Sequence, residues 1–250
     1  MKAIDLNCDL GEGAGNDAAL MPLISSANIA CGGHAGDART MRATIRLARE
    51  HGVAAGAHPG YADRADFGRA DLDLHTDAIE ELVKSQVEAL LAIARDEGVS
   101  VRHVKPHGAL YNRSARHRET ALAIARAVAA VDRRLILFGQ AGGASLGAAA
   151  EIGLMTAAEA FADRVYQADG SLMPRDRPGA VIIEPARAVA QALELVLHGS
   201  VTAADGSRVR IAADTICLHG DAAGAVEFAR SLRAALAAAG VAVAAVSLGC

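Results

Sequence analysis

The chain has 250 residues, a formal net charge of −4 at pH 7 and 52% hydrophobic residues, but only 3% of it is aromatic. A chain of this length buries roughly 75% of the surface that it exposes when unfolded, so it needs no disulfide or metal to fold. The near-balanced charge argues against nucleic acid as the main partner, because phosphate binding needs a basic face.

The cysteines and the N-terminal residues indicate the compartment. Cys8, Cys31, Cys217 and Cys250 form no C-x-x-C motif, so we expect reduced, mostly buried thiols. The first seven residues are charged where a signal peptide needs an apolar region, and no run approaches the roughly 20 apolar residues of a membrane span. We therefore expect a cytoplasmic protein with no membrane partner.

Short apolar runs alternate with helical patterns along the chain, which is typical of βαβ units and a parallel sheet. The runs lack polar alternation, as expected of strands that are covered on both faces. The predicted strands are Ala3–Cys8, Ala27–Cys31, Val53–Ala57, Val101–Lys105, Leu135–Gly139, Met155–Ala160 and Thr215–His219. No linker, composition shift or repeat divides them. We predict one α/β domain over residues 1–250, a (β/α) barrel of seven or eight mostly parallel strands, with an open sheet as the less favoured alternative.

Caps and apolar stripes mark the helices between these strands. Asp37 is predicted to cap a helix that Gly52 ends, and Thr76 to cap a longer helix that stops before Gly98. Further helices are predicted at Glu119–Val131, Ala186–Leu197 and Ala223–Ala239.

Two connections are unusual. The stretch from Gly60 to His75 is too long for an ordinary βα loop, so we expect it to shape a site. The stretch Val201–Ile211 places Asp205-Gly206 between β-prone residues, which predicts a hairpin.

Polar and ionisable residues gather where the apolar runs stop. They are Asn7, Asp9 and Glu12, then Asn28 and His34, then His58, then Lys105, His107 and Tyr111, then Glu159 and Arg164, and finally His219 and Asp221. The carboxyl ends of parallel strands share the face of a barrel that carries the active site, so these residues are predicted to line one pocket. Carboxylates beside imidazoles supply acids and bases at neutral pH. Asp5 lies early in its strand and is expected to pin a loop or orient a neighbour.

Lys105 ends a buried strand, where an ammonium group needs a negative partner. Either a structural carboxylate fills that need, or a substrate carboxylate, a phosphate or a developing oxyanion does. The chain has no G-x-x-x-x-G-K-[ST], G-x-S-x-G or H-E-x-x-H motif, which excludes a P-loop ATPase, a serine-hydrolase elbow and this zinc-protease motif. A mononuclear metal site made by Asp9 or Asp5 with two histidines is left open.

Several segments resemble the LamB/YcsF family, in one order through nearly the whole chain. They are Asp5–Glu12, Ser26–His34, Gly56–Tyr61, Asp66–Arg69, Val104–Asn112, Glu159–Arg164, Tyr166–Arg175 and Ile216–Asp221. Such a series is far more specific than a single short pattern. Ala62 stands where the family has proline, and Val165 interrupts residues 162–167, which otherwise follow the family pattern. Neither departure removes a candidate catalytic group.

The resemblance implies a seven-stranded β/α barrel akin to those of glycoside hydrolases and deacetylases. It also implies the ATP-coupled opening of 5-oxo-L-proline to L-glutamate by a 5-oxoprolinase, whose A subunit belongs to this family and whose subunits B and C are partners. ATP is then a co-substrate, and the sequence requires no metal beyond any Mg²⁺ that accompanies ATP. The isolated chain is expected to show little activity, because it has no recognisable phosphate-binding loop.

Opening an unstrained lactam needs an activated water, a stabilised oxyanion and an acid for the leaving nitrogen. The predicted catalytic residues are Asp9 or His107 as base, His34 and His58 as acids or phosphate ligands, and Lys105 on the oxyanion or phosphate. The predicted substrate-binding residues are Asn7, Glu12, Asn28, Tyr111, Glu159, Arg164, His219 and Asp221. Two alternatives stay open: a stand-alone metal-dependent deacetylase or amidohydrolase, and a non-catalytic ligand-binding subunit.

Overall fold

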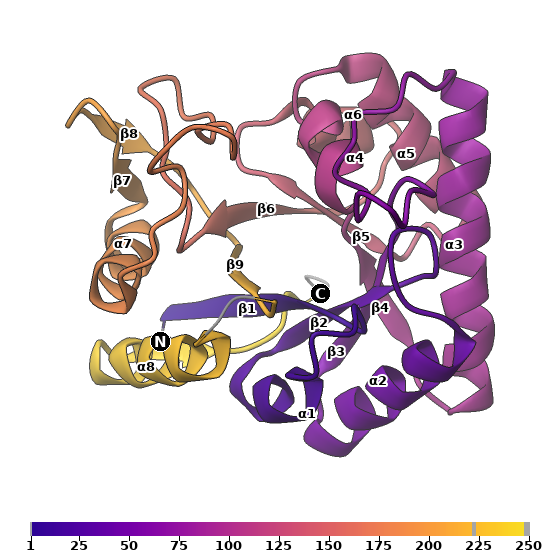
Figure 1. Ribbon diagram of the computed structural model, residues 1–250, viewed down its shortest axis with the longest axis horizontal. Coiled ribbons are helices and arrows are strands. Elements are labelled where there is room, and N and C mark those ends of the chain that lie inside the picture. Colours follow the sequence, from indigo (N-terminus) through magenta and orange to yellow (C-terminus); the bar gives the residue numbers. More distant parts are fainter. Residues whose placement is uncertain (1, 222–223, 248–250) are drawn as a thin grey trace.

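The computed structural model describes residues 2–221 and 224–247, and seven parallel strands among them close into a barrel (Figure 1). These strands are β1 Lys2–Leu10, β2 Ser26–Ala30, β3 Ala54–His58, β4 Val101–Val104, β5 Ile136–Gln140, β6 Thr156–Phe161 and β9 Thr215–His219. They pair in this order, and β9 closes the ring on β1, with Asp9 opposite His219. The predicted α/β barrel is confirmed. An eighth parallel strand, β10 (Val241–Val243), pairs with the start of β1 and takes no part in closing the ring.

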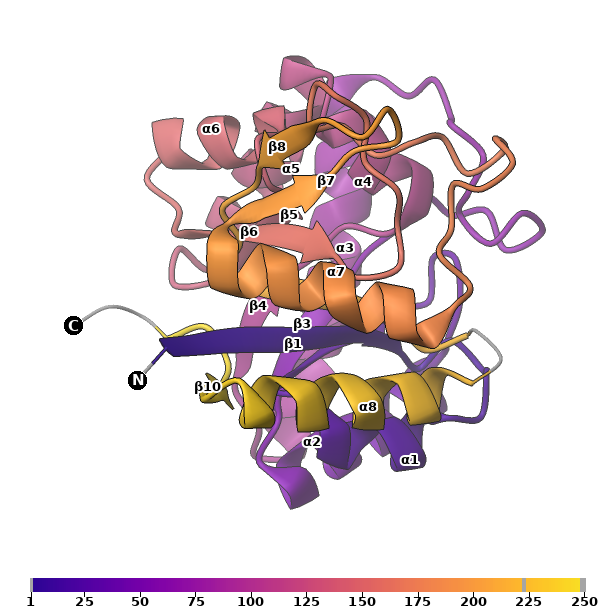
Figure 2. The same cartoon turned by 90° about the vertical axis from the view of Figure 1, so that its left-hand side faces the viewer.

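Helices surround the barrel, and Figure 2 shows α7 and α8 on either side of β1. The helical elements are α1 Asp17–Leu20, the 3₁₀ turn η1 Met21–Leu23, α2 Ala38–His51, α3 Thr76–Asp96, α4 Gly108–Ser114, α5 Arg118–Val131, α6 Ala144–Glu151, α7 Pro185–His198 and α8 Ala225–Ala238. The sequence prediction lacks α1, η1, α4 and α6, which have four, three, seven and eight residues and are too short to show a helical period. No helix within residues 2–221 and 224–247 combines the length and apolar character of a membrane span.

The ends of the helices follow from local chemistry. At the start of α2 the Asp37 carboxylate accepts a hydrogen bond of 2.8 Å from the backbone N–H of Thr40, and Gly52 ends the helix with φ 66°, both as predicted. The predicted Thr76 cap is wrong: His75 is the extended N-cap and Thr76 is the first helical residue. Asp77 in the first turn supplies the negative charge that this end favours. Ala223, predicted as helical, lies outside the described residues.

The predicted hairpin is present as strands β7 (Ser200–Thr202) and β8 (Arg208–Arg210), which pair antiparallel. In its turn, Gly206 adopts φ 84°, and the Asp205 carboxylate accepts a hydrogen bond of 3.0 Å from the backbone N–H of Ser207. The hairpin follows α7 and borders the mouth of the barrel, where Arg210 lines the cavity described below.

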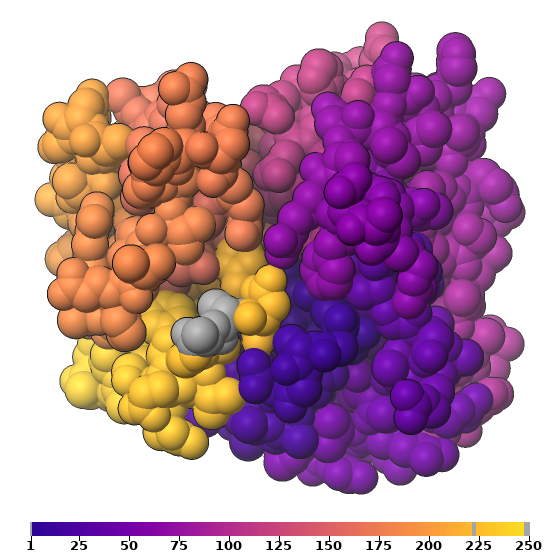
Figure 3. Space-filling model, viewed as in Figure 1, coloured from indigo at the N-terminus to yellow at the C-terminus, as the bar shows by residue number. Residues whose placement is uncertain are grey.

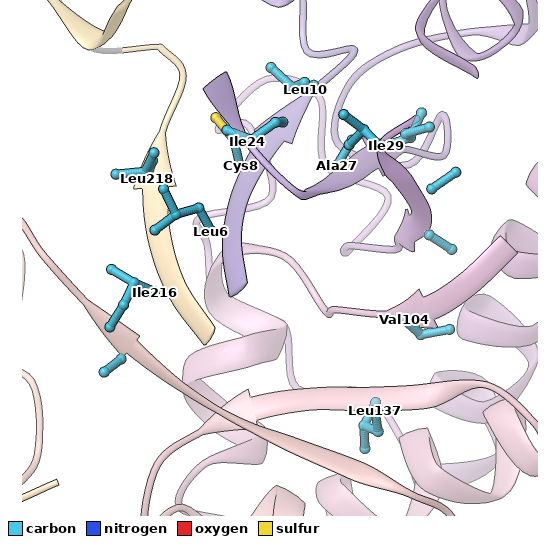
Figure 4. Packing of buried hydrophobic residues seen from close by; sticks show 14 of the residues in the cluster. Leu6, Cys8, Leu10, Ile24, Ala27, Ile29, Val104, Leu137, Ile216 and Leu218 are labelled. Carbon is cyan, nitrogen blue, oxygen red and sulfur yellow. The ribbon is translucent and has the colours of Figure 1, made fainter. Parts of the chain in front are cut away.

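The apolar core lies between the barrel and its helices, and Figure 4 shows part of it. Leu6, Cys8 and Leu10 of β1 pack in this layer. The residues between them point the other way, since Asn7 and Asp9 form hydrogen bonds across the barrel. The expectation that the strands lack polar alternation is therefore wrong for β1, because the barrel interior is itself polar.

The described cysteines behave as predicted. Cys8, Cys31 and Cys217 are buried and free, while Cys250 lies outside the described residues. Burial raises the pKa of the Cys8 and Cys217 thiols well above the usual value and that of Cys31 to about 12, so none is a ready thiolate.

Candidate active site

Asp5 anchors the floor of the barrel interior. Its carboxylate accepts hydrogen bonds from the hydroxyls of Ser25 (2.6 Å), Ser26 (2.7 Å) and Thr215 (2.5 Å). Burial raises the pKa of Asp5, and these hydroxyls offset part of the effect. As expected, Asp5 orients its neighbours and lies away from the cavity.

A layer of amides lies above this floor. The Asn28 side-chain NH₂ donates to Asn7 Oδ1 at 2.7 Å and to Asp9 Oδ1 at 2.8 Å. Asn28 Oδ1 lies 2.8 Å from His103 Nε2, and burial lowers the pKa of His103 to about 3, so the neutral ring donates this bond. Both asparagines are fully buried and neither lines the cavity. Asn7 and Asn28 were predicted to bind substrate. In the structure they lie outside the cavity lining and instead help to position Asp9.

Lys105 follows β4 and carries a buried ammonium group. Its Nζ lies 2.9 Å from Asp9 Oδ1 and 2.8 Å from Glu159 Oε1, and it donates to Asn7 Oδ1 at 3.2 Å. Burial alone would lower the pKa of Lys105, but the carboxylates hold it well above the usual value. The structural-carboxylate partner left open by the sequence is therefore the one observed, although Lys105 also borders the cavity.

Asp9 lies at the centre of the polar cluster. Its second oxygen, Oδ2, is 3.3 Å from His58 Nε2. Burial would raise the pKa of Asp9, but His58 and Lys105 outweigh burial and hold it well below the usual range. Asp9 is thus a fixed negative charge, held from three sides.

Three imidazoles surround the Glu12 carboxylate. Glu12 Oε1 lies 3.1 Å from His34 Nε2, 3.4 Å from His107 Nδ1 and 3.7 Å from His58 Nε2. The rings of His34 and His107 stack at 3.6 Å. Burial lowers the pKa of His34 to about 3 and of His107 to about 2, so both are neutral at neutral pH. Burial, aided by the charge of Asp9, raises the pKa of Glu12 to about 7.

The long connection after β3 holds these rings in place. Phe67 has φ 56°, which is rare for a residue with a side chain. Its carbonyl accepts a hydrogen bond of 2.8 Å from His107 Nε2, and its ring meets His34 edge-on at 5.5 Å. A Cβ on Gly60 would lie 2.7 Å from His34 Nδ1, so only glycine fits there. The stretch from Gly60 to His75 thus contacts two of the predicted site residues, His34 and His107.

A second group faces this cluster across the mouth. His219 Nδ1 lies 2.8 Å from Asp163 Oδ2, and Arg175 Nη2 lies 2.7 Å from His219 Nε2. The arginine can only donate, so His219 Nε2 accepts this hydrogen bond and His219 Nδ1 faces the Asp163 carboxylate. Asp221 is exposed and pairs with Arg69 at 3.1 Å.

Arg164 and Tyr111 are buried beside the same opening. Arg164 Nη2 donates to the carbonyl of Met173 at 2.6 Å, and burial lowers the pKa of Arg164 to about 10. Burial, strengthened by the charge of Glu159, raises the pKa of Tyr111 well above the usual value.

The groups open on one cavity of about 1060 Å³. Figure 3 shows the surface hollowed between the segment after β6 (orange) and the loop before α3 (purple). The predicted residues in the lining are Asp9, Glu12, His58, Lys105, His107, Tyr111, Arg164, His219 and Asp221. The other four, Asn7, Asn28, His34 and Glu159, lie directly beneath the lining and support it.

Comparison with known proteins decides the family. Residues 4–248 match the model of the LamB/YcsF family. The chain belongs to this family. It is 52% identical to the A subunit of 5-oxoprolinase from Chloroflexus aurantiacus (strain ATCC 29364 / DSM 637 / Y-400-fl) and 54% identical to that from Chloroflexus aggregans (strain MD-66 / DSM 9485). Each comparison covers 97% of this chain and 98% of the relative.

Solved structures agree with this assignment. This LamB/YcsF chain is similar to a lactam utilization protein from Thermus thermophilus, with a TM-score of 0.92, 45% identity, and 98% of this chain and 100% of that chain covered. The structure of T48 deacetylase with substrate gives a TM-score of 0.51 at 16% identity, covering 97% of this chain and 87% of that one. The second likeness shows the fold alone, as the expected deacetylase-like barrel.

Several residues that support the candidate site were not among the predicted site residues. His103 supports Asn28, the Cys217 thiol lies 3.1 Å from Lys105 Nζ, and Asp163 and Arg175 hold His219. A signal for two of them exists in the sequence. His103 is two residues before Lys105 and Cys217 two before His219, so strand periodicity puts each pair on one face.

Proposed function

We propose that this chain acts as the A subunit of an ATP-dependent 5-oxoprolinase, which opens 5-oxo-L-proline to L-glutamate while ATP is hydrolysed to ADP and phosphate. The observation that carries the proposal is the identity of 52–54% over nearly the whole chain to proteins named as the A subunit of 5-oxoprolinase. The name of the Thermus protein, lactam utilization protein, points to the same class of bond.

The site contains the groups that lactam opening needs. Lys105 borders the cavity with a buried positive charge, which suits an oxyanion or a phosphate on the lactam oxygen. The Asp9–His58 pair suits proton transfer: burial opposes protonation of His58, but Asp9 outweighs it and raises the pKa of His58. The neutral His34 and His107 are unsuited to act as acids, which narrows the roles expected from the sequence.

The cavity supports a second ligand beside the lactam. Its volume of about 1060 Å³ far exceeds the space that a five-membered ring occupies. Arg69, Arg164 and Arg175 line it and suit the substrate carboxylate or a phosphate. Because the sequence has no phosphate-binding loop of a known type, we propose that subunits B and C are required for the coupled reaction and that ATP is a co-substrate of the assembly.

The test measures glutamate and ADP formation from 5-oxoproline by this chain alone and with subunits B and C. We expect turnover only with all three, and a loss of roughly 10²-fold or more in Asp9→Asn. Asp77→Asn, a matched change of an exposed aspartate on α3, leaves the rate unchanged. ATP-independent opening by the pure chain would contradict the coupling and favour the stand-alone hydrolase. Full turnover by Asp9→Asn in the complex would favour the non-catalytic binding role.

A further inference from the structure

Glu12 and the three imidazoles around it converge on one point. The four facing atoms, Glu12 Oε1, His34 Nε2, His58 Nε2 and His107 Nδ1, all lie within 4.8 Å of one another. His107 Nδ1 and His58 Nε2 are only 3.0 Å apart. The separations from Glu12 are 3.1, 3.4 and 3.7 Å.

Backbone carbonyls fix the hydrogens on two of the rings. His58 Nδ1 lies 2.7 Å from the carbonyl of Lys105, and His107 Nε2 lies 2.8 Å from the carbonyl of Phe67. A carbonyl oxygen only accepts, so each of these nitrogens carries its ring's hydrogen. In the neutral rings, His58 Nε2 and His107 Nδ1 then face each other with lone pairs at 3.0 Å. Such an arrangement requires a positive species between them, either a proton or a metal ion.

We propose that Glu12, His34, His58 and His107 bind a divalent transition-metal ion, with Zn²⁺ the best fit. With bonds of about 2.0–2.1 Å, the ligand atoms of a tetrahedral zinc site lie about 3.4 Å apart. The four separations given above, from 3.0 to 3.7 Å, lie on both sides of this value, and all six are below 4.8 Å. Three imidazoles with one carboxylate suit zinc better than Ca²⁺ or Mg²⁺, which prefer oxygen ligands.

The surroundings of two of the three rings, those of His58 and His107, match those of metal-binding histidines, whereas His34 Nδ1 is buried without a hydrogen-bond partner among the described residues. Such histidines usually donate their other N–H to a carbonyl or carboxylate, which fixes the ring and its tautomer. His58 and His107 both do so.

The carboxylate ligand differs from the one that the sequence left open. Asp5 is enclosed by three hydroxyls, and Asp9 Oδ1 is held by Lys105 and Asn28. Glu12 instead faces the rings and lines the cavity. A metal here would supply a Lewis acid at the cavity wall. His58 Nε2 would then hold the metal, so the proton-transfer role given above to the Asp9–His58 pair would apply only without it. The inference concerns binding alone and stands whether or not the proposed substrate is correct.

Zinc titration by calorimetry of chelator-treated, dialysed protein near neutral pH tests the proposal. We expect one Zn²⁺ per chain and, with Co²⁺, the intense visible absorption of a tetrahedral site. His34→Gln and His107→Gln each lower the zinc affinity by roughly 100-fold or more. His51→Gln, which changes an exposed histidine of α2, leaves the affinity unchanged. Zinc raises the melting temperature of the wild type and of His51→Gln, but that of His107→Gln much less.

Two results would overturn the proposal without relying on any variant. The first is that the wild type binds no stoichiometric zinc, in which case a proton lies between His58 Nε2 and His107 Nδ1. The second is a weak octahedral cobalt spectrum. Equal zinc affinity in the wild type and the His34→Gln/His107→Gln double variant would place the bound ion elsewhere and would also overturn it. These three measurements test the metal site even if the protein shows no 5-oxoprolinase activity.

Discussion

Replacing Lys105 with methionine separates its structural role from its proposed catalytic one. Methionine keeps the unbranched apolar part of the side chain, one atom shorter, but removes the charge that lies 2.9 Å from Asp9 and 2.8 Å from Glu159. Lys105 is 3% exposed and the Glu159 side chain is fully buried, so water does not replace the lost partner. The variant leaves two carboxylates in the barrel without their shared cation.

The size of the effect follows from this burial. Removing one partner of a buried ion pair costs about 3–5 kcal/mol, because the other charge is left uncompensated. For a chain of this size each kcal/mol shifts the melting temperature by about 2–4 °C, which predicts a drop of about 6–20 °C. The matched variant Lys84→Met changes a partly exposed lysine on α3 and is expected to stay within about 0.5 kcal/mol of the wild type.

The loss of unfolding free energy in Lys105→Met also depends on pH. In the folded wild type His58 and Lys105 depress the pKa of Asp9, so Asp9 stabilises the protein above its unfolded pKa of about 3.9 and loses this effect as the pH falls. Without Lys105, Asp9 takes up a proton more readily. The difference in unfolding free energy between wild type and variant is therefore largest at neutral pH and narrows toward pH values of about 4.

Thermal unfolding and turnover in the presence of the proposed partner subunits B and C are measured on one preparation. We expect Lys105→Met to lose roughly 10²-fold in rate per folded molecule. The double variant Lys105→Met/Glu159→Gln removes one stranded charge, so it recovers part of the stability and none of the rate. An unchanged melting temperature in Lys105→Met would refute the buried-pair reasoning. Near-normal turnover with a lowered melting temperature would exclude a catalytic role for Lys105.

Two further predictions concern the support of the site. Gly60→Ala places a Cβ 2.7 Å from His34 Nδ1 and is expected to lower the free energy of unfolding in urea by about 1–3 kcal/mol. The control Gly147→Ala in α6, where a Cβ meets nothing within 4 Å, is expected to raise it by about 0.5–1 kcal/mol. Equal effects of the two substitutions would contradict the close approach at Gly60. Burial lowers the pKa of His103 to about 3, so the unfolded state takes up the proton first and stability is lost as the pH falls below about 6.5. His103→Gln has no such group. As the pH falls below about 6.5, the unfolding free energy of the wild type is therefore expected to drop by about 1.4 kcal/mol more per pH unit than that of the variant. Parallel pH profiles of the two proteins would count against a neutral buried ring.

Much of the barrel is legible in the sequence, because a parallel strand covered by helices leaves a short apolar run between helical patterns. Each of the seven ring strands was predicted to within two residues at either end. The convergence of Asp9, His58 and Lys105 follows from the same topology, since their strands end on one face. The short α4 and α6 left too few residues for a period to show.

The sequence by itself determined the barrel, its family and most of the residues at the mouth, because strand period, caps and ordered motifs are properties of the chain alone. Only the tertiary structure decided which of these polar groups face the cavity and which support it from beneath. Asn28 and Tyr111 both follow the pattern of polar residues at strand ends, yet Asn28 is enclosed by Asn7, Asp9 and His103. Partners and burial come from contacts between strands far apart in sequence, and those contacts set the charge of each group. For that reason Asp9 is held ionised and His34 neutral, although each side chain by itself titrates within a few units of neutral pH.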